Sequence, residues 1–515
     1  MKLPQNNRSD ILLSSVFCAV FALSSLYSTD SVSAEWNLRP TLTVSETYTD
    51  NLRLGGLGGV GGLGGFGGFG GFGGSTKKEG DFITQINPGF SLAGSSRRFK
   101  LDSNYIMNNL IFAENLDRSR IRHRLNADAT AELIRDLFFV DGRAAIFQQN
   151  ASLLGAQTTD NINLTGNRVD MRIYSISPYL RHRFQDFATT ELRYTHGIVE
   201  SSANGLRNSQ RDTYQFGLNS GDYFRILNWG LNYSHNTIHI DGNNFRSGRT
   251  IEMEQSIANL RYNVTPRFGL TATGGYERNS FVSVRGSPSS PRWTAGFVWV
   301  PDERTTINVR AGQRFFGPTF GGELDHRARL TTWNATYSED ITTMNQQAGQ
   351  FNASGLPNID PFGGQALLGL NNFLTNRVFL QKRFQASVTV NGAKNTATLT
   401  VFNMFRQAYT PAIEDFELLG TDAVLLNKTK QMGGNALWSH RITPRTSVNF
   451  NASFIRFKFL AADRVNDNLI YSVDLTKRFL PNVTGVLQYR RIERDSNQFS
   501  TAVANMITAS LTMNF

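Results

Sequence analysis

The sequence predicts an all-β protein: a single large antiparallel transmembrane β-barrel of roughly 20 to 22 strands, with short periplasmic turns and longer extracellular loops. Three observations favour this fold class. The last nine residues alternate between apolar and polar side chains and end on phenylalanine, the first 34 read as a secretory signal, and tight and long connections alternate along the chain. A soluble sandwich could share the first pattern, but it has no reason to segregate its connections.

The C-terminal stretch is the clearest strand. Ile507, Ala509, Leu511, Met513 and Phe515 share one parity, and the residues between them are threonine, serine and asparagine. Successive strand side chains point to opposite faces, so the stretch has one apolar and one small polar face. Bacterial outer-membrane barrels typically end in such a strand, whose terminal phenylalanine the barrel-assembly machinery can read. We interpret these five residues as the closing strand and its assembly signal; an edge strand of a soluble sandwich is the alternative.

The first 34 residues predict a signal peptide. Lys2 and Arg8 form a short basic region, residues 11–27 form an apolar core, and Val32-Ser33-Ala34 predicts cleavage before Glu35. The only cysteine, Cys18, lies inside this segment. The mature chain, residues 35–515, is therefore expected to have no disulfide and no cysteine-based metal site.

Composition narrows the class further. Mean hydropathy is −0.30 and no later stretch could cross a bilayer as a helix, yet the chain has 38 Phe, 15 Tyr and 46 Gly. A membrane barrel has this composition because only alternate residues face lipid. The formal charge of +11 belongs to the mature part, since the basic and acidic residues of the signal segment balance. An exported protein is not expected to bind nucleic acid, so the charge predicts a basic lumen or surface.

The mature chain is expected to begin directly with a strand, because apolar residues share a parity from Trp36 to Tyr48. This leaves no room for a plug domain of on the order of a hundred residues before the barrel. Residues 55–74 follow as a Gly-Gly-X repeat with X being Leu, Val or Phe. We expect a mobile first extracellular loop there, either a surface tether or a tolerated slippage insertion.

The connections separate into two kinds. Tight ones with proline or a short polar turn occur at 264–267, 300–303, 442–445 and 480–483. Longer polar ones occur at 149–168, 200–212, 239–249, 280–292 and 409–426. This alternation is typical of short periplasmic turns and long outward loops. Counting alternating runs gives about 21 strands, whereas an even number is required. Residues 340–375 show no clean strand period, so either a strand lies there or the segment threads the lumen as a constriction.

Several motifs resemble those of a known family. The specific block contains Gly312-Gln313-Arg314-Phe315-Phe316-Gly317, His326-Arg327-Ala328-Arg329, and Trp333 followed by Tyr337-Ser338-Glu339-Asp340; Tyr48-Thr49-Asp50-Asn51-Leu52 and Gly274-Gly275-Tyr276-Glu277 fit as well. This set resembles the PEP-CTERM system-associated outer-membrane barrel family. The resemblance spans the mature chain apart from the Gly-Gly-X repeat. It implies a Gram-negative bacterium whose exosortase sorting system accompanies exopolysaccharide loci, with polysaccharide-export components as further partners, but no defined substrate.

Chemical motifs are sparse. The seven histidines are scattered, and neither a zinc-protease motif nor a nucleophile elbow occurs. His235 and His239 lie four apart on a predicted strand end, which is a weak spacing for a metal. We therefore expect no enzymatic activity, no metal and no cofactor.

The predicted lumen parity is rich in arginine. The candidate lumen-lining residues are Arg122, Arg124, Arg181, Arg183, Arg193, Arg310 and Arg314. A charge on the lipid face costs about 2–4 kcal/mol at the midplane, so these side chains should face inward or lie above the membrane. Asp128, Glu132 and Glu191 share their parity, so the alternatives are a generic charged wall and a conduit for anionic solutes. Arg327 and Arg329 share parity with Trp333 instead, which predicts a position above the bilayer or a bulge.

Three functions follow for a barrel in the outer membrane of a Gram-negative bacterium, surrounded by lipid and lipopolysaccharide. The first is a conduit for exopolysaccharide or another anionic polymer. The second is a general diffusion porin, and the third is a non-conducting structural or adhesion barrel.

Overall fold

The computed structural model describes residues 35–54, 78–242, 246–349 and 374–515. The predicted signal peptide and the Gly-Gly-X repeat therefore lie outside the described residues, as does the middle of the segment 340–375.

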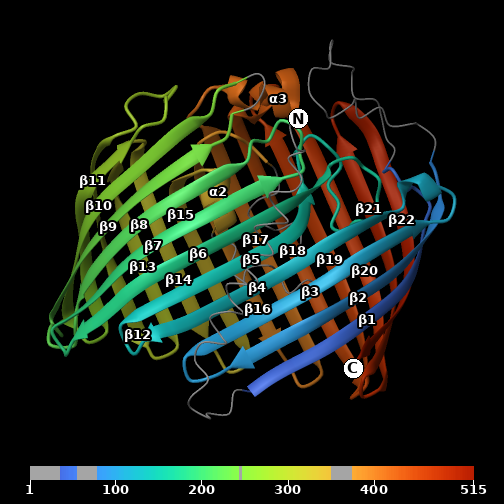
Figure 1. Cartoon of the computed structure of the whole chain (residues 1–515), viewed down its shortest axis with the longest axis horizontal. Helices are drawn as coiled ribbons and strands as arrows, with labels where there is room; N and C mark the ends of the chain where they lie inside the picture. The colour runs from blue at the N-terminus through green and yellow to red at the C-terminus, as the bar shows by residue number, and fades with distance from the viewer. Residues whose placement is uncertain (1–34, 55–77, 243–245, 350–373) are drawn as a thin grey trace, which may run out of the picture.

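The chain forms one closed wall of 22 antiparallel strands (Figure 1). Each strand pairs with the next, and β22 pairs with β1. The predicted fold class, including 20 to 22 strands, is confirmed. The strands are β1 Glu35–Thr49, β2 Asp81–Ser95, β3 Phe99–Phe112, β4 Arg120–Ile134, β5 Phe138–Asn150, β6 Arg168–Phe184, β7 Ala188–Ser201, β8 Ser209–Ser220, β9 Leu227–Ile240, β10 Arg249–Thr265, β11 Phe268–Asn279, β12 Ser290–Asp302, β13 Thr305–Arg314, β14 Gly317–Arg327, β15 Thr331–Thr342, β16 Phe379–Asn391, β17 Asn395–Ala408, β18 Lys428–Thr443, β19 Thr446–Phe459, β20 Arg464–Leu480, β21 Val483–Ser496 and β22 Phe499–Asn514.

Short helical segments lie in the connections at one end of the barrel. They are η1 Leu116–Arg118, α2 Met344–Gly349, η3 Ala412–Asp415, α3 Phe416–Leu419 and η4 Gly420–Asn427. Among the residues that the structure describes, no helix has the length and apolarity needed to cross a membrane.

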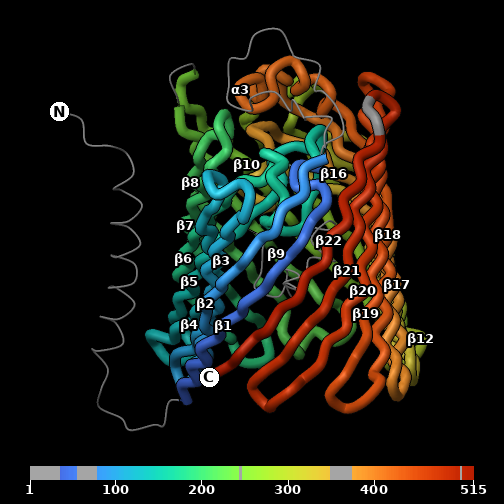
Figure 2. Tube along the Cα trace, turned by 90° about the vertical axis from the view of Figure 1, so that its right-hand side faces the viewer, coloured from blue at the N-terminus to red at the C-terminus, as the bar shows by residue number. Residues whose placement is uncertain are grey.

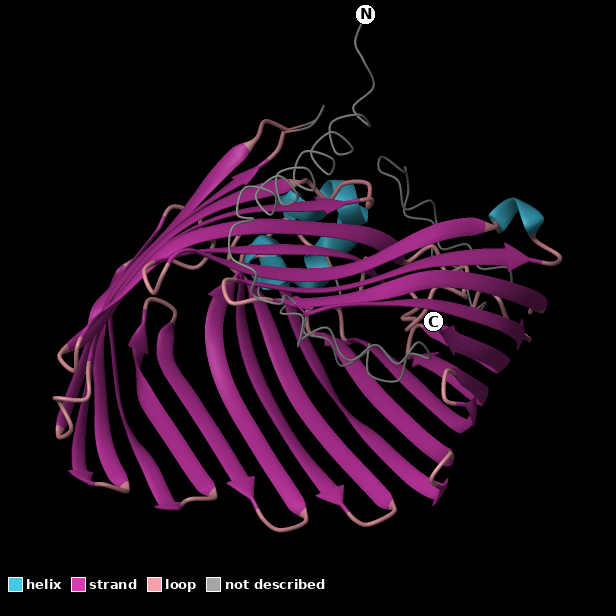
Figure 3. Cartoon of the chain, turned by 60° about the horizontal axis from the view of Figure 1, so that its bottom comes forward, coloured by secondary structure: helices cyan, strands magenta, loops and turns pink. Residues whose placement is uncertain are grey.

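The two ends of the barrel differ in their connections. The start of β1 and the C-terminus lie together at one end, and α3 lies at the other (Figure 2). At the end with the termini the connections are turns such as Pro266-Arg267 and Pro481-Asn482. In Figure 3 the helical segments lie away from these turns, toward the opposite end, some of them close together and some apart. In outer-membrane barrels the short turns are periplasmic, so we name these the periplasmic and extracellular ends.

The closing strand shows why the alternation of apolar and polar residues predicts the fold correctly. In β22, Ile507 and Leu511 are exposed on the outside, whereas Thr508 and Ser510 are buried on the lumen side. β1 and β22 pair in register from Thr41–Asn514 to Thr49–Met506. On the lumen side, the hydroxyl of Thr508 hydrogen bonds to that of Thr47 at 2.9 Å, and Thr512 makes the same contact with Thr43 at 2.9 Å. The N–H of Phe515 donates to the carbonyl of Pro40 at 2.9 Å, which extends the seam to the last residue.

Outward aromatic side chains occur near both ends of the strands. Trp36, Trp299 and Trp333 are exposed near the periplasmic end, and Tyr48 and Tyr276 near the extracellular end. Between them the outward residues are mainly leucine, valine, isoleucine and phenylalanine. This is the aromatic-bounded apolar belt of a membrane barrel.

The parity problem at Arg327 and Arg329 disappears in the structure. β14 ends at Arg327, residues 328–330 form a periplasmic turn, and β15 begins at Thr331. Arg327 pairs with Thr332, one position away from the outward Trp333, so it has the lumen parity of its own strand. No bulge is needed, and Arg329 lies in the turn, beyond the ends of both strands. Of the two alternatives for 340–375, the extra strand is not needed, because 22 strands close the wall and the described residues of the segment beyond the end of β15 at Thr342 form no strand.

Replacing Leu399 with arginine should lower the free energy of unfolding by about 2–4 kcal/mol, because Leu399 points from β17 into the apolar belt. Its neighbour Thr400 has the opposite parity, so Thr400→Arg places the same charge in the lumen and should cost less than about 1 kcal/mol. Urea titration in lipid vesicles measures both. Equal losses for the two variants would contradict the assignment of faces.

Candidate functional site

The extracellular half of the lumen is filled by connections that fold inward. These are residues 151–167 between β5 and β6, the described parts of the β15–β16 connection, and residues 409–427 between β17 and β18. Their apolar side chains pack against lumen-facing apolar residues of the wall in three clusters. Inward apolar residues at this end would face water in an empty barrel, so the wall and the connections need each other.

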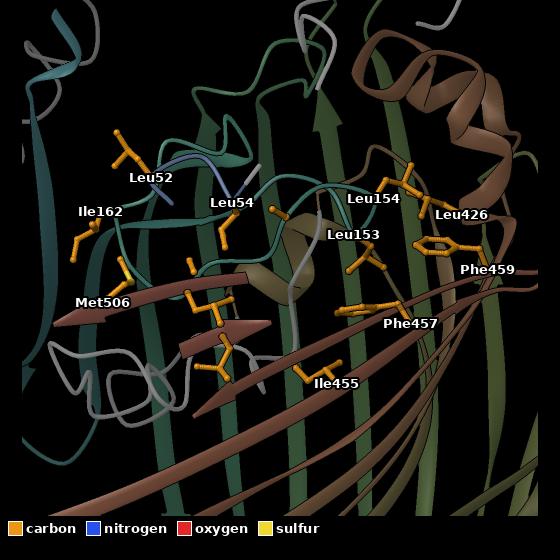
Figure 4. Close-up of a cluster of buried hydrophobic side chains, with 14 of the residues drawn as sticks. Leu52, Leu54, Leu153, Leu154, Ile162, Leu426, Ile455, Phe457, Phe459 and Met506 are labelled. Atoms are coloured by element: carbon orange, nitrogen blue, oxygen red, sulfur yellow. The ribbon is translucent and has the colours of Figure 1, made fainter. Parts of the chain in front are cut away.

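Residues 151–167, here called the crossing loop, reach the opposite wall. Figure 4 shows Leu153 and Leu154 close to Phe457 and Phe459 of β19. In the same cluster, Ile162 packs with wall residues of the far side, among them Met506 of β22. The crossing loop therefore spans the lumen between β5–β6 and β19–β22.

Arginines of the far wall hold the backbone of the crossing loop. Arg464 of β20 and Arg494 of β21 both donate to the carbonyl of Leu154, at 3.2 and 2.8 Å. Arg490 of β21 donates to the hydroxyl of Thr159 at 3.2 Å and pairs with the Asp160 carboxylate. Charged donors make stronger hydrogen bonds than neutral ones, and here most acceptors are uncharged.

Arginines of the near wall hold the other side of the loop. Arg120 of β4 donates to the carbonyl of Asn161 at 2.7 Å. Arg168, where β6 begins, donates to the carbonyls of Thr158 and Gln148 at 2.7 and 2.9 Å. Guanidinium groups from both walls thus satisfy carbonyl oxygens that would otherwise be buried without partners.

A second set of ion pairs and hydrogen bonds joins the β17–β18 connection to the extracellular ends of strands β7 to β10. Glu414 in η3 lies 2.9 Å from Arg207 and 2.8 Å from Arg249, and Arg246 is 3.7 Å away. The next residue, Asp415, accepts hydrogen bonds from the Thr375 hydroxyl and the Asn376 N–H, each at 2.7 Å. Burial raises the pKa of the Asp415 carboxyl above its ordinary value, against the effect of these donors.

The seven arginines predicted to line the lumen lie in separate places. Arg122 is at the extracellular end of β4, 2.7 Å from Asp170, and Arg124 is two residues further along. Arg181 and Arg193 share Glu191 in the periplasmic half of β6 and β7, where Arg193 lies over the Tyr179 ring at 3.7 Å.

The remaining three are elsewhere. Arg183 is exposed at the periplasmic rim beside Asp222, at 2.9 Å. Arg310 and Arg314 are on β13, of which only Arg314 is paired with carboxylates. The structure does not bring the seven together into one site.

The family-motif residues form a turn and its support. The Arg314 guanidinium lies 2.9 Å from the Glu277 carboxylate and 4.8 Å over the centre of the Phe316 ring. The same carboxylate also binds Arg292 at 2.5 Å. Gly317 has a φ of +111°, a backbone conformation that favours glycine, and it starts β14 after the two-residue turn. Phe315 lies just beyond the end of β13 at Arg314, and it packs inward on Tyr409 with ring centroids 5.9 Å apart.

The other motif residues lie at the opposite, periplasmic end. His326 hydrogen bonds through Nδ1 to the Thr305 hydroxyl at 2.9 Å, and the Trp333 indole donates to Thr331 at 3.0 Å. Within the described ranges, no three His, Cys, Asp or Glu side chains gather in a way that could hold a metal ion.

Several lumen arginines have no carboxylate within 4.0 Å in the part of the chain that the structure describes, among them Arg124, Arg211, Arg310 and Arg383. The Nε atoms of Arg124 and Arg211 are also buried without a hydrogen-bond partner. Sequence reasoning found Arg124 and Arg310 and missed the other two. Strand parity would have found both, because Arg211 has the opposite parity to the outward Tyr214, and Arg383 has the opposite parity to the outward Phe384. Both arginines therefore face the lumen.

Comparison with known proteins finds solved structures of similar architecture. No protein-family model and no curated protein sequence matches the chain. Two solved structures of the FrpB iron transporter from Neisseria meningitidis, the F5-1 and F3-3 variants, superpose with a TM-score of 0.51 at 9% and 10% identity. They cover 94% and 96% of this chain and 83% of their own.

The chain shares the closed β-barrel fold of the FrpB structures. The siderophore receptor PirA from Pseudomonas aeruginosa is also similar, with a TM-score of 0.45, 12% identity, and coverage of 93% of this chain and 80% of that one. At these identities the likeness concerns the architecture alone.

Replacing both Arg464 and Arg494 with glutamine should release the crossing loop, because each charge-assisted hydrogen bond contributes on the order of 1 kcal/mol or more. The open fraction should rise at least about tenfold. Thr158 is 1% exposed, so a cysteine placed there reports opening by its reaction with a membrane-impermeant maleimide.

Arg491→Gln is the matched control, since Arg491 lies on the same strand but belongs to the outward face and pairs with Glu493 at 2.5 Å. Equal labelling rates in the double variant and the control would show that Arg464 and Arg494 do not hold the crossing loop in place.

Proposed function

We propose that the protein is a gated outer-membrane conduit for anionic solutes or acidic polysaccharide in a Gram-negative bacterium. The observation that carries the proposal is the excess of arginine on the lumen wall. Those that hold the crossing loop bind it mainly through neutral oxygens, and others, among them Arg211 and Arg310, have no carboxylate within 4.0 Å in the described ranges. A passage lined by uncompensated positive charge and bounded by low-dielectric walls concentrates anions.

The closed extracellular half supports a gate. The crossing loop is held at both walls by hydrogen bonds from arginine, and an anion entering the lumen offers those arginines a stronger acceptor than a carbonyl oxygen. Substrate and loop therefore compete for the same donors. A ligand that binds the open state better shifts the population toward it.

Within this substrate class, the sequence resemblance supports acidic polysaccharide rather than small anionic solutes. A PEP-CTERM system-associated barrel would work beside exopolysaccharide synthesis, and acidic polysaccharides carry repeated carboxylates that suit a basic lumen. Polysaccharide-export components, the barrel-assembly machinery and lipopolysaccharide would be its partners. We propose no catalytic role.

One observation favours a different function, a non-conducting structural barrel. The three apolar clusters fill the extracellular half as a core fills a soluble domain. If that packing is permanent, the loops are a stabilising plug and the protein acts through its outer surface.

Planar-bilayer recordings of the purified protein test the proposal. The wild type should show small, rarely open, anion-selective channels, and Arg464→Gln with Arg494→Gln should raise the open probability several-fold. An oligomer of glucuronate should block the current at concentrations where a neutral glucose oligomer does not. Equal block by both would indicate a general porin, and silence in both proteins would indicate the structural barrel.

Reversing the charge of Arg211 and Arg310 to glutamate should lower the ratio of chloride to potassium permeability, because both side chains lie on the lumen wall. Arg278→Glu is the control, since Arg278 pairs with Glu254 on the outward face of β10 and β11. An unchanged permeability ratio in the double variant would remove the electrostatic basis of the proposal.

A further inference from the structure

Four cations gather on the outside of the barrel at the extracellular end of β18 and β19. Lys428 and Lys430 are on β18, and Arg456 and Lys458 are on β19. We call these four residues the outer basic patch. It lies on the wall behind the crossing-loop contacts, and it plays no part in the proposed conduit.

The alternation of burial shows that these side chains point outward. Their neighbours on β18, Thr429 and Gln431, are 2% and 1% exposed, and Phe457 and Phe459 on β19 are each 1% exposed. These four face the lumen core beneath the crossing loop. The cations occupy the positions between them, so they belong to the opposite face.

Two of the lysines stand directly opposite each other. Lys430 pairs with Lys458 across the β18–β19 ladder. Like charges at directly opposed positions destabilise a sheet, because their side chains start about 5 Å apart. In the resolved ranges of this chain, no carboxylate lies within 4.0 Å of Lys428, Lys430 or Lys458. The pair is therefore unfavourable until an anion lies between the two ammonium groups.

Arg456 differs from the lysines because it has a partner. Its guanidinium donates to both oxygens of Asp467 on β20, at 2.8 and 2.7 Å. It also lies 5.8 Å over the ring of Phe454. Arg456 thus marks one edge of the patch and leaves the three lysines as its uncompensated part.

The height of the patch points to the lipid headgroups. Phe454 is 39% exposed and is the last outward aromatic residue of β19, and Lys458 follows four residues later toward the extracellular end. On β18, Lys430 and Lys428 lie beyond the outward Met432 in the same direction. Aromatic residues mark the boundary of the hydrocarbon, so the lysines lie just outside it, at the level of the outer-leaflet headgroups.

The opposite wall has the other sign at this height. Outward positions near the extracellular ends of β7, β8 and β10 carry Glu200, Asp212, Glu252 and Glu254, and the outward Arg172 and Arg278 there stand opposite Glu200 and Glu254, which leaves this wall acidic on balance. Anion attraction is therefore a property of one side of the barrel rather than of the whole rim.

We propose that the outer basic patch binds the phosphate groups of the glycolipid that forms the outer leaflet, the diphosphorylated disaccharide headgroup of lipid A. Lysine is a flexible point charge that suits phosphate, and a headgroup with two phosphates can reach several lysines at once. The apolar belt directly below would hold the acyl chains of the same molecule. A free phosphate ion would gain nothing from that belt, which is why the position favours a lipid.

The test uses the purified full chain in detergent, with lipid binding counted by native mass spectrometry. Lys430→Gln with Lys458→Gln should weaken binding of diphosphoryl lipid A on the order of tenfold. The loss should be smaller for monophosphoryl lipid A, and millimolar inorganic phosphate should not compete. Lys477→Gln is the matched control, because Lys477 is an exposed lysine over the Phe479 ring on the same wall, near the periplasmic end of β20.

Thermal unfolding without phosphorylated lipid separates binding from folding damage. The double variant should be at least as stable as the wild type, because the opposed charges are removed, and only the wild type and Lys477→Gln should gain stability when diphosphoryl lipid A is added. Unchanged lipid A affinity in the double variant would overturn the proposal. So would competition by inorganic phosphate, which would identify a free-anion site. Neither result depends on whether the lumen conducts.

Discussion

A chain that crosses hydrocarbon must bond every backbone N–H and C=O within itself, and a sheet does so only when it closes. Here the closure is the β1–β22 seam, from Thr41–Asn514 to Thr49–Met506. Once the wall is closed, every strand residue faces either lipid or lumen, and its neighbour faces the other way. The crossing loop, the lumen arginines and the outer basic patch are all placed by this one constraint, because parity decides on which side of the wall a side chain acts.

The sequence was sufficient for the fold because the constraint is written into it residue by residue. In β22, Ile507, Leu511 and the polar residues between them have the faces that the alternation predicts. The tight prolyl connections at Pro266 and Pro481 mark the periplasmic turns, since such short links leave room only for antiparallel neighbours. Strand number is harder to obtain, because a short hairpin such as β13–β14 has a turn whose aromatic residues continue the apparent pattern.

The site was only partly predictable, because its contacts join residues far apart in the chain. Leu154 meets Arg464 and Arg494 across 310 and 340 residues. No spacing rule reaches that far. The local pattern also misleads: in β21, Ile492 shares its parity with Arg490 and Arg494, which breaks the rule of one apolar and one polar face. The rule fails there because the lumen is filled with apolar side chains at this height, so both faces of the wall carry mixed residues.

Near the extracellular end of the wall, apolar side chains face the lumen and charged side chains face outward, which is the reverse of the usual order in a membrane barrel. In the extracellular part of β19, Phe457 and Phe459 point inward to the crossing loop while Arg456 and Lys458 point outward. Below Phe454 the order is the usual one, with apolar residues outward. The strand therefore changes from a membrane wall to the wall of a small protein core, and the change marks the level at which hydrocarbon ends. An apolar inward face needs a loop to cover it, and a charged outward face needs water or headgroups. Both demands are met at one height, so filling the lumen and contacting the headgroups are two consequences of extending the strands beyond the apolar belt.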